Sequence, residues 1–353
     1  MSDARSKAVL GKLADLAGRN NYGIDLGTTS LREPLGNGDI IDVPSISDLT
    51  VIAAGTTSTA PAAVTTNVLS MNANLEPWIN ASIPQLASMQ LLDGGWEGQV
   101  AEQAFKQLKN YVDEQWMLYL LQSVIADTAS SPAYWYNAGG ASLGSDDFAN
   151  AKAALLSQDG VQAQDLVCFL SPFAEASASQ ISGFVPNFQQ AEQGNLGIPK
   201  IGSIHGVPVY VTNSVSRLRT VATTAYAVSG GVQTATVAAG HGVVVGAKLK
   251  FDTVTSGGDE AAAVTVSAVG ATSIAWSTSN TGSATEAGTI TLQQCENLMV
   301  NKAQNFSAGQ GMMKARTVAD LQSTGDSLQV STVWARVSRA GHAIAFGSPP
   351  SGA

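Results

Sequence analysis

Charged residues are scarce in this chain, because only 13% of its 353 residues are Asp, Glu, Lys or Arg. A soluble monomer usually covers about 25–35% of its surface with such residues. Hydrophobic residues (44%) and 35 glycines make up much of the chain instead. This balance is typical of a protein whose surface is largely covered by further copies of itself.

Cysteine is nearly absent, and the two cysteines of the chain are Cys168 and Cys295. A disulfide framework needs more cysteines and a secretory context, so we expect two buried free thiols. Nowhere do 18 apolar residues follow one another, and no apolar signal core follows Met1. The chain is therefore expected to be a soluble protein made inside the cell, without a membrane-spanning helix.

Positive charge is also in short supply, and the formal net charge is −9. Proteins that coat nucleic acid need clustered Lys and Arg, so the chain as a whole is not of that class. The first twenty residues are an exception, with four basic residues against two acidic ones; the basic residues are Arg5, Lys7, Lys12 and Arg19. This segment is either an amphipathic helix with Leu10, Leu13 and Leu16 on its apolar face, or an arm that faces an anionic polymer.

Lysine is missing altogether from residues 21–80, which hold one arginine and six acidic residues. Two strands are predicted there, Asp39–Ile52 with an interruption at Pro44 and Ala63–Met71, with a turn region over 53–61 between them. A two-stranded ribbon is marginal in water on its own, so we expect it to lie on a neighbouring subunit. The candidate intersubunit residues of this ribbon are Arg32, Asp39, Asp42 and Asp48.

A long amphipathic helix is predicted from about Glu97 to Ile125, directly after a pair of glycines. Its charged residues recur at steps of four, three and four, which places them on one stripe of a helix; they are Glu102, Lys106, Lys109 and Asp113. The opposite arc is expected to be buried, and it holds Ala101, Ala104, Leu108, Tyr111, Val112 and Tyr119. Residues 116–121 are apolar on every side and need cover all round. The predicted core of this spine helix is Leu108, Tyr111, Val112, Trp116 and Tyr119.

The segment after the spine helix alternates between helices and strands. A helix is predicted over Ser145–Leu156, with two acidic residues in its first turn, and a buried strand over Asp165–Leu170. A second helix over Pro172–Phe184 and a strand over Gly206–Thr212 follow. This alternation indicates a compact mixed α/β unit.

Residues 220–247 contain no charged residue, and Thr, Val, Ala, Ser and Gly dominate there and in the residues that follow. Candidate strands alternate with glycine-containing turns, the pattern of a small all-β module; they are Thr234–Ala238, Lys248–Val254, Ala262–Ala268, Thr272–Ser277 and Thr289–Leu292. The flanking segments fit together better across this stretch. We therefore interpret it as an insertion.

The end of the chain is predicted to be a strand pair over Ser327–Phe346, with its turn at Arg339–His342. We expect these late strands to pack against the spine helix. Such contacts would join the first and last thirds of the chain into one structural unit.

A search for catalytic and metal-binding residues finds one weak motif. Residues 140–144 match the G-x-S-x-G pattern of hydrolase nucleophile elbows around Ser142, but an aromatic loop precedes them where a buried strand is required. His205, His241 and His342 each stand beside a glycine, with no second His or Cys at ligand spacing. We expect no catalytic residue, no cofactor and no metal. The aromatic residues lie among few basic ones, so core or interface anchoring fits them better than base stacking.

The order of these parts resembles that of the major capsid protein of tailed bacteriophages, which has the Hong Kong 97 type fold. Three segments are most similar: Gly38–Val51 (GDIIDVPSISDLTV) to the flap strand, Ile83–Leu121 to the spine helix, and Gly197–Asn213 (GIPKIGSIHGVPVYVTN) to the domain at capsomer centres. The resemblance covers most of the chain outside the insertion, and the order of the segments carries it.

The resemblance implies an α+β fold of five parts. These are an N-terminal arm (1–22), an extended β-hairpin loop (23–80), a peripheral domain with the spine helix and peripheral strands (81–135 and 325–353), an α/β axial domain (136–218 and 295–324) and an inserted small all-β domain (219–294). It also implies a capsid subunit that assembles as pentamers and hexamers into an icosahedral shell around double-stranded DNA, which the arm would contact non-specifically. The implied partners are scaffolding, portal and decoration proteins, with no membrane, and the implied location is the virion, after synthesis in the host bacterial cytoplasm.

Two features differ from some members of that family. Some members join subunits through an isopeptide bond from a lysine in the flap, but residues 21–80 of this chain contain no lysine. Some members also carry a long N-terminal scaffolding segment. Here the flap begins within about 25 residues of Met1, so a scaffold is expected to be a separate chain. Other functions stay open: a tail-tube or receptor-binding component of a virion, an encapsulin-like nanocompartment shell, and a serine hydrolase that uses Ser142.

Overall fold

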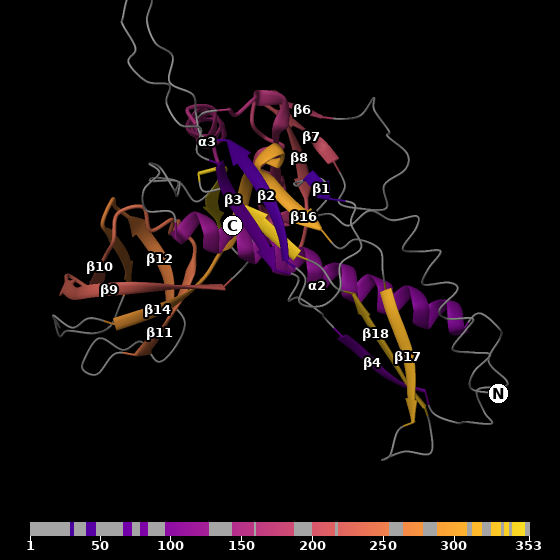
Figure 1. Ribbon diagram of the computed structural model, residues 1–353. Coiled ribbons are helices and arrows are strands. Elements are labelled where there is room, and N and C mark those ends of the chain that lie inside the picture. The colour runs from indigo at the N-terminus through magenta and orange to yellow at the C-terminus, as the bar shows by residue number, and fades with distance from the viewer. Residues whose placement is uncertain are drawn as a thin grey trace, which may run out of the picture.

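The computed structural model describes fifteen segments of the chain: residues 29–31, 40–46, 66–72, 78–83, 96–126, 143–158, 160–186, 200–215, 218–253, 264–277, 288–308, 313–319, 326–332, 335–338 and 341–349. These residues form a mixed fold of helices and five separate sheets, one of them a closed barrel. Figure 1 shows the long helix α2 (Trp96–Ala126) running past the other elements, with the barrel towards one side and the strands β4, β17 and β18 towards the other.

A six-stranded sheet forms the centre of the described fold. Its order is β20 (Ala343–Ser348), β15 (Cys295–Asn301), β5 (Leu166–Leu170), β8 (Val207–Val211), β7 (Lys200–Ile204) and β6 (Phe184–Pro186). Only β5 and β8 run parallel, and the other neighbours are antiparallel. Every residue of β20, β15 and β5 is buried, as expected for strands covered on both faces.

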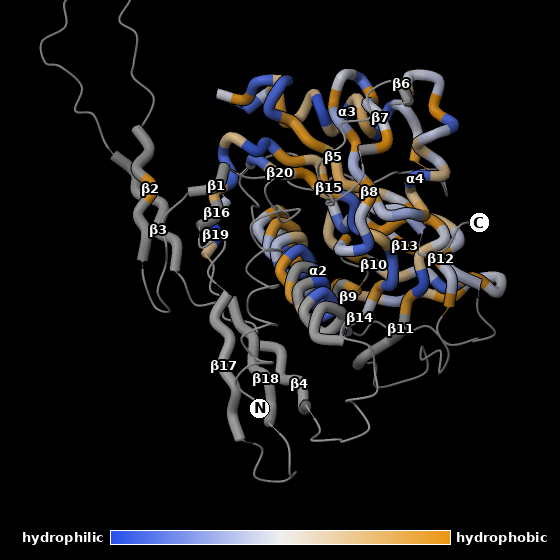
Figure 2. Tube along the Cα trace, turned by 90° about the vertical axis from the view of Figure 1, so that its right-hand side faces the viewer, coloured by the Kyte–Doolittle hydropathy of each residue, from blue (hydrophilic) through white to orange (hydrophobic). Residues whose placement is uncertain are grey.

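Helices cover the two faces of this sheet, as Figure 2 shows. Because side chains alternate along a strand, Val167 and Phe169 of β5 pack with α2, whereas Cys168 and Leu170 face the other side. The helices α3 (Ser145–Leu156) and α4 (Pro172–Ala178) contribute to the cluster on that second side. The result is a three-layered core with helices on both sides of the sheet.

The helix α2 confirms the predicted spine helix to within one residue at each end. Leu108, Val112 and Trp116 are buried as predicted, but Tyr111 is 43% exposed and Asp113, predicted to be wet, is 4% exposed. The reason is that the buried arc rotates along the helix. At about 100° per residue, Tyr111 lies half a turn away from the fully buried Leu120, and Asp113 lies on nearly the same side as Leu120. A single stripe drawn for the whole helix therefore misplaces both residues.

The helices of the second layer differ in how well they match the prediction. The bounds of α3 are those predicted, and the Asp147 carboxylate accepts the Gly144 amide at 2.8 Å, which caps the first turn. The predicted helix Pro172–Phe184 is wrong in nearly its last half, because α4 ends at Ala178. The chain then continues in turns, and Phe184 pairs with Ile204 as the start of β6.

The closed barrel consists of β9 (Leu218–Ser229), β10 (Val232–Val237), β11 (Lys248–Thr253), β12 (Val264–Val269), β13 (Ser273–Ser277) and β14 (Gly288–Gln293). Five of these strands match predicted ones, and β9 was not predicted. The turn between β9 and β10 is Gly230–Gly231, and both glycines have positive φ (58° and 78°), as a two-residue hairpin turn that follows strand twist requires. The barrel has its own core, which includes Tyr226 and Trp276.

Three smaller sheets complete the described fold. They are β1 (Thr29–Leu31) with β16 (Asn305–Ala308) and β19 (Ala335–Ser338), β4 (Trp78–Ile83) with β18 (Asp326–Thr332) and β17 (Met313–Ala319), and β2 (Ile40–Ile46) with β3 (Thr66–Asn72). The predicted strand pair at the end of the chain is wrong, because β18, β19 and β20 belong to three different sheets. These three strands nevertheless contact α2, as predicted.

The hairpin β2–β3 confirms the predicted ribbon but not its interruption at Pro44. Pro44 stands inside β2 opposite Val68, in an unbroken antiparallel register from Ile40 to Ile46. A proline is tolerated in a strand whose missing N–H would point away from the partner, as it can in a ribbon with two open edges. The connection 47–65 lies outside the described residues.

A polar junction joins the barrel to the six-stranded sheet. Gln294 is fully buried between the two units. Its Oε1 accepts the Val244 amide at 3.2 Å, and its Nε2 donates to the Gly242 carbonyl at 2.6 Å and to Glu296 Oε1 at 2.9 Å. Gly347 of β20 lies against the same groups, so the barrel loop 242–244 can approach the sheet only where β20 has no side chain.

Replacing Gly347 by alanine is expected to open this junction. The new Cβ would lie 2.7 Å from Gln294 Nε2 and 2.9 Å from Val244 Cγ1, which is too close for either contact, and it would lie a tight 3.1 Å from the Gly242 carbonyl oxygen. Overpacking of this kind costs about 1–3 kcal/mol, so amide exchange over 242–244 should accelerate. Gly183→Ala is the control, because the nearest atom to its new Cβ is 3.8 Å away. In this variant, amide exchange over 242–244 should stay as in the wild type. Unchanged exchange of the Val244 amide in Gly347→Ala would contradict the close packing.

Candidate functional site

The hairpin β2–β3 is the first candidate, because its strands pair with each other and with no further described strand. An isolated pair of strands is marginal in water, so the hairpin gains stability when another surface covers it. Of its four predicted intersubunit residues, only Asp42 stands in a described strand, opposite Ser70. Arg32, Asp39 and Asp48 lie outside the described residues.

The hairpin is tied to the spine helix through β19, since β3 contacts β19 and β19 contacts α2. The Tyr119 hydroxyl accepts the Ser338 amide at 3.1 Å, and the Arg336 guanidinium stands 4.7 Å from the centre of the Tyr119 ring. Burial lowers the pKa of Arg336 to about 10, which still leaves this side chain charged at neutral pH. A charged guanidinium over an aromatic face is an attractive contact. Tyr119, predicted as a core residue, is partly buried, and its contacts join α2 to β19.

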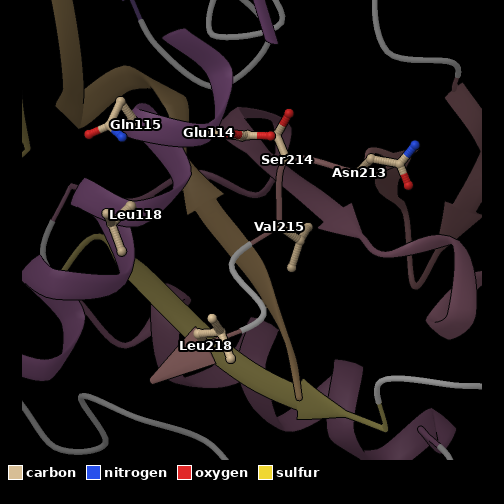
Figure 3. Close-up of a pocket in the computed structure, with 7 residues that line it drawn as sticks. All are labelled: Glu114, Gln115, Leu118, Asn213, Ser214, Val215 and Leu218. Atoms are coloured by element: carbon tan, nitrogen blue, oxygen red, sulfur yellow. The ribbon is translucent and has the colours of Figure 1, made fainter. Parts of the chain in front are cut away.

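An open pocket of about 740 Å³ lies beside the middle of α2 (Figure 3). One wall is made by α2, and the other by the chain that leads from β8 into the barrel; the lining residues are Glu114, Gln115, Leu118, Asn213, Ser214, Val215 and Leu218. Leu218, the first residue of β9, is 63% exposed, and Glu114 is also exposed. The described lining of the pocket therefore combines polar side chains and the Glu114 carboxylate with three apolar side chains.

The contacts of the histidines indicate a structural rather than a catalytic role. Ser145, rather than the predicted candidate Ser142, lies beside His205, with Oγ 3.1 Å from Nε2. Both side-chain contacts of His205 use Nε2 and go to Ser145, so within the described residues no carboxylate orients the ring as a hydrolase needs. Ser142 itself lies outside the described residues. This pair fastens the turn of β7 and β8 to the start of α3.

The remaining chemistry-bearing residues are buried. His241 bonds the Gly270 carbonyl at 2.9 Å, and His342 Nδ1 lies 3.2 Å from Asn301 Nδ2. Cys168 and Cys295 are buried thiols that form no disulfide, as predicted, and burial strongly raises the pKa of Cys168, which makes its thiolate inaccessible. Among the described residues, no three His, Cys, Asp or Glu side chains lie together so that they could hold a metal ion. No helix in this part of the chain is long and apolar enough to cross a bilayer.

Two parts of this surface escaped the sequence analysis, and one predicted site cannot be placed. The Tyr119–Ser338 contact and the pocket both join residues about a hundred or more positions apart, and no local motif marks such pairs. The predicted DNA-facing residues Arg5, Lys7, Lys12 and Arg19 lie outside the described residues.

Comparison with known proteins identifies the fold. No family model and no curated protein matches the chain. A chain from the capsid structure of the Cyanophage P-SCSP1u matches with a TM-score of 0.51 at 12% identity, over 94% of this chain and 90% of that chain. A chain from the capsid of a native GTA particle matches with a TM-score of 0.52 at 9% identity, over 93% of this chain and 90% of that chain. At this identity the likeness concerns the fold, and it confirms at that level the resemblance to phage capsid subunits.

Proposed function

We propose that this chain is the shell-forming subunit of a bacteriophage capsid and has a structural rather than an enzymatic role. The observation that carries the proposal is the fold shared with two capsid chains over at least nine tenths of every chain compared. The hairpin supports it independently, because a two-stranded sheet without further strands gains most from a neighbouring subunit. The low charge of the chain fits the same role.

The finer assignment follows the Hong Kong 97 type fold. In it, residues 1–22 are the arm, 23–80 the extended hairpin loop, 81–135 and 325–353 the peripheral domain, 136–218 and 295–324 the axial domain, and 219–294 the inserted domain. The closed barrel over Leu218–Gln293 supports the last of these, since its end strands β9 and β14 pair with each other and Leu218 stands opposite Gln293. An insertion whose ends meet can be accommodated without disturbing the flanking domain.

The proposed assembly consists of pentamers and hexamers that close into an icosahedral shell around double-stranded DNA. The basic arm residues would contact the DNA backbone non-specifically, because phosphates attract clustered Lys and Arg irrespective of sequence. Scaffolding, portal and decoration proteins would be separate partners. The assembled protein would reside in the virion after synthesis in the host bacterial cytoplasm.

Electron microscopy and analytical ultracentrifugation of the purified chain test this proposal. We expect closed, thin-walled polyhedral particles, since repeated interfaces on closed rings generate a shell. Stacked open rings or fibres would instead indicate a tail-tube component. Closed particles that, when isolated from cells, enclose a protein cargo and no DNA would indicate a nanocompartment shell. A solitary, protease-resistant 36.2 kDa species under all assembly conditions would overturn the proposal.

A further inference from the structure

The buried His241 uses both nitrogens of its ring in a way that requires the neutral form. Its Nδ1 accepts the Val243 amide at 3.1 Å, so this nitrogen carries no proton. Its Nε2 lies 2.9 Å from the Gly270 carbonyl oxygen, which can only accept, so the ring proton is on Nε2. A second proton on Nδ1 would break the bond to Val243 and place two N–H groups against each other. Because the residue is 5% exposed, water cannot replace the lost partner unless the loop moves.

The amide that His241 binds lies in the middle of the contact between the barrel and the central sheet. Gln294 binds the residues on either side of Val243, since its Nε2 donates to the Gly242 carbonyl at 2.6 Å and its Oε1 accepts the Val244 amide at 3.2 Å. The same two residues pack closely against β20. Loss of the middle hydrogen bond should therefore loosen the contacts on both sides of it.

The backbone of this loop and the connections of the barrel both permit movement. Gly240, Gly242 and Gly246 have positive φ (71°, 65° and 87°), and glycine adopts positive and negative φ at similar cost. The first and last residues of the barrel strands, Leu218 and Gln293, stand opposite each other in the pair of β9 and β14. The chain therefore enters and leaves the barrel at one place, about which the barrel can turn once the loop is released.

The charged and titratable groups around His241 come from other elements. Residues 220–247 and 270–273 contain no Asp, Glu, Lys or Arg. Glu296 of β15 is buried and accepts Gln294 Nε2 at 2.9 Å, and Lys248 at the start of β11 is exposed. The other buried histidine, His342, precedes β20, at the opposite end of that strand from the barrel contact. Histidine is the side chain whose charge ordinarily changes between pH 5 and 8.

We propose that protonation of His241 releases the barrel from the central sheet, so that the loop 241–244 is an acid-sensitive junction. The closed junction needs the neutral ring, whereas a ring that reaches water takes up a proton with an ordinary pKa of about 6.5. The open state therefore binds more protons, and opening is favoured as the pH falls below that value. Between pH 7.5 and 5 the ratio of open to closed junctions should rise by up to about 30-fold. The proposal does not depend on the assembly of a capsid, because the junction lies within one chain.

Hydrogen exchange of the full-length, unassembled chain tests this junction. The protection factors of the Val243 and Val244 amides, corrected for the intrinsic exchange rate at each pH, should fall about 10-fold to 30-fold between pH 7.5 and 5. The amides of β5 should keep their protection, because the core stays folded. In His241→Asn, the new amide oxygen can still accept the Val243 amide but cannot be protonated, so the fall should be less than about twofold. Equal falls in wild type and His241→Asn would overturn the proposal.

Three further variants assign the response to one group. His205→Asn is the matched control, because His205 is exposed and its side chain contacts Ser145 instead of the loop, and the full response should remain. Glu296→Gln and His342→Asn remove the two other buried titratable groups and should also retain it. If either of them abolishes the response while His241→Asn retains it, the proposal is wrong.

A distance measurement tests whether the barrel itself moves. Spin labels on cysteines that replace exposed Val232 of the barrel and exposed Ala153 of α3 report the separation of the two units, and the native Cys168 and Cys295 are too deeply buried to react. In double electron–electron resonance, the distance distribution should broaden at pH 5 in the wild-type background and stay narrow in His241→Asn. A distribution that is the same at both pH values, even with faster exchange of the loop, would show local opening alone and would overturn the release of the barrel.

Discussion

Trp116→Ala should lower the free energy of unfolding by about 3–5 kcal/mol, which is the range for removal of a large aromatic side chain from a core. Trp116 is 1% exposed and meets Phe169 of the central sheet edge to face, with ring centres 5.4 Å apart. The substitution removes this contact and leaves a cavity between α2 and the sheet that rigid neighbours fill only in part. Chemical denaturation followed by far-ultraviolet circular dichroism measures the loss.

Two further variants show whether burial causes this loss. Trp116→Phe keeps an aromatic ring and should cost less than the alanine variant. Tyr111→Ala removes a large aromatic residue from the same helix at a position that is 43% exposed, and it should cost about 1 kcal/mol or less. Equal losses for Trp116→Ala and Tyr111→Ala would contradict the orientation of α2 on the sheet.

The parts of the fold that the sequence predicts are those with strong local signals. The period of α2 and the acidic first turn of α3 are set by nearby residues, so their bounds are correct to within a residue. The central strand β5 is an uninterrupted apolar run, which also reads correctly. In each of these elements, local preference and the surrounding structure favour the same conformation.

The predictions fail where distant parts of the chain decide the structure. The strand β9 (LRTVATTAYAVS) is rich in small residues and carries a weak strand signal, but closing the barrel gives it two partners, β10 and β14. Asp113 is buried because the second half of α2 turns that side towards the sheet. The strands β18, β19 and β20 follow one another closely in the sequence, yet they belong to three different sheets.

The candidate site is less predictable than the fold for the same reason. Tyr119 was expected from its helical position to be a core residue, but its contacts with β19 depend on Arg336 and Ser338, more than 200 positions later. Glu114 and Leu218 form one pocket only because the barrel begins beside α2. Contacts between residues so far apart in the chain leave no motif in the sequence. The absence of lysine from residues 21–80, in contrast, can be seen in the sequence alone.

Asn297→Asp should destabilise the central sheet strongly. Asn297 is fully buried in β15, where its Oδ1 accepts the Ser171 amide at 2.8 Å and its Nδ2 donates to the Phe346 carbonyl at 3.2 Å and to Ser348 Oγ at 3.0 Å. An aspartate keeps the acceptor but turns the donor into a second oxygen that faces a carbonyl. The buried carboxylate keeps the Ser171 amide as a donor and has the Ser348 hydroxyl within reach, but its second oxygen also faces the Phe346 carbonyl, and no cation is among the partners of Asn297. Such a buried charge is expected to cost about 3–5 kcal/mol at neutral pH.

The pH dependence distinguishes this charge effect from a simple loss of hydrogen bonds. Burial and the facing carbonyl should raise the pKa of the new carboxyl in the folded state above the value of about 3.9 that it has in the unfolded chain. The folded state then binds more protons than the unfolded state between these two pKa values, so the variant regains stability relative to wild type as the pH falls from 7 towards about 4.

Asn297→Ala should lose about 2–4 kcal/mol with no such recovery, since it only leaves buried groups without partners. Exposed Asn110 provides the matched control, and Asn110→Asp should unfold like the wild type across this range. If the difference between Asn297→Asp and wild type is independent of pH, the donor role of Asn297 between β15 and β20 is wrong.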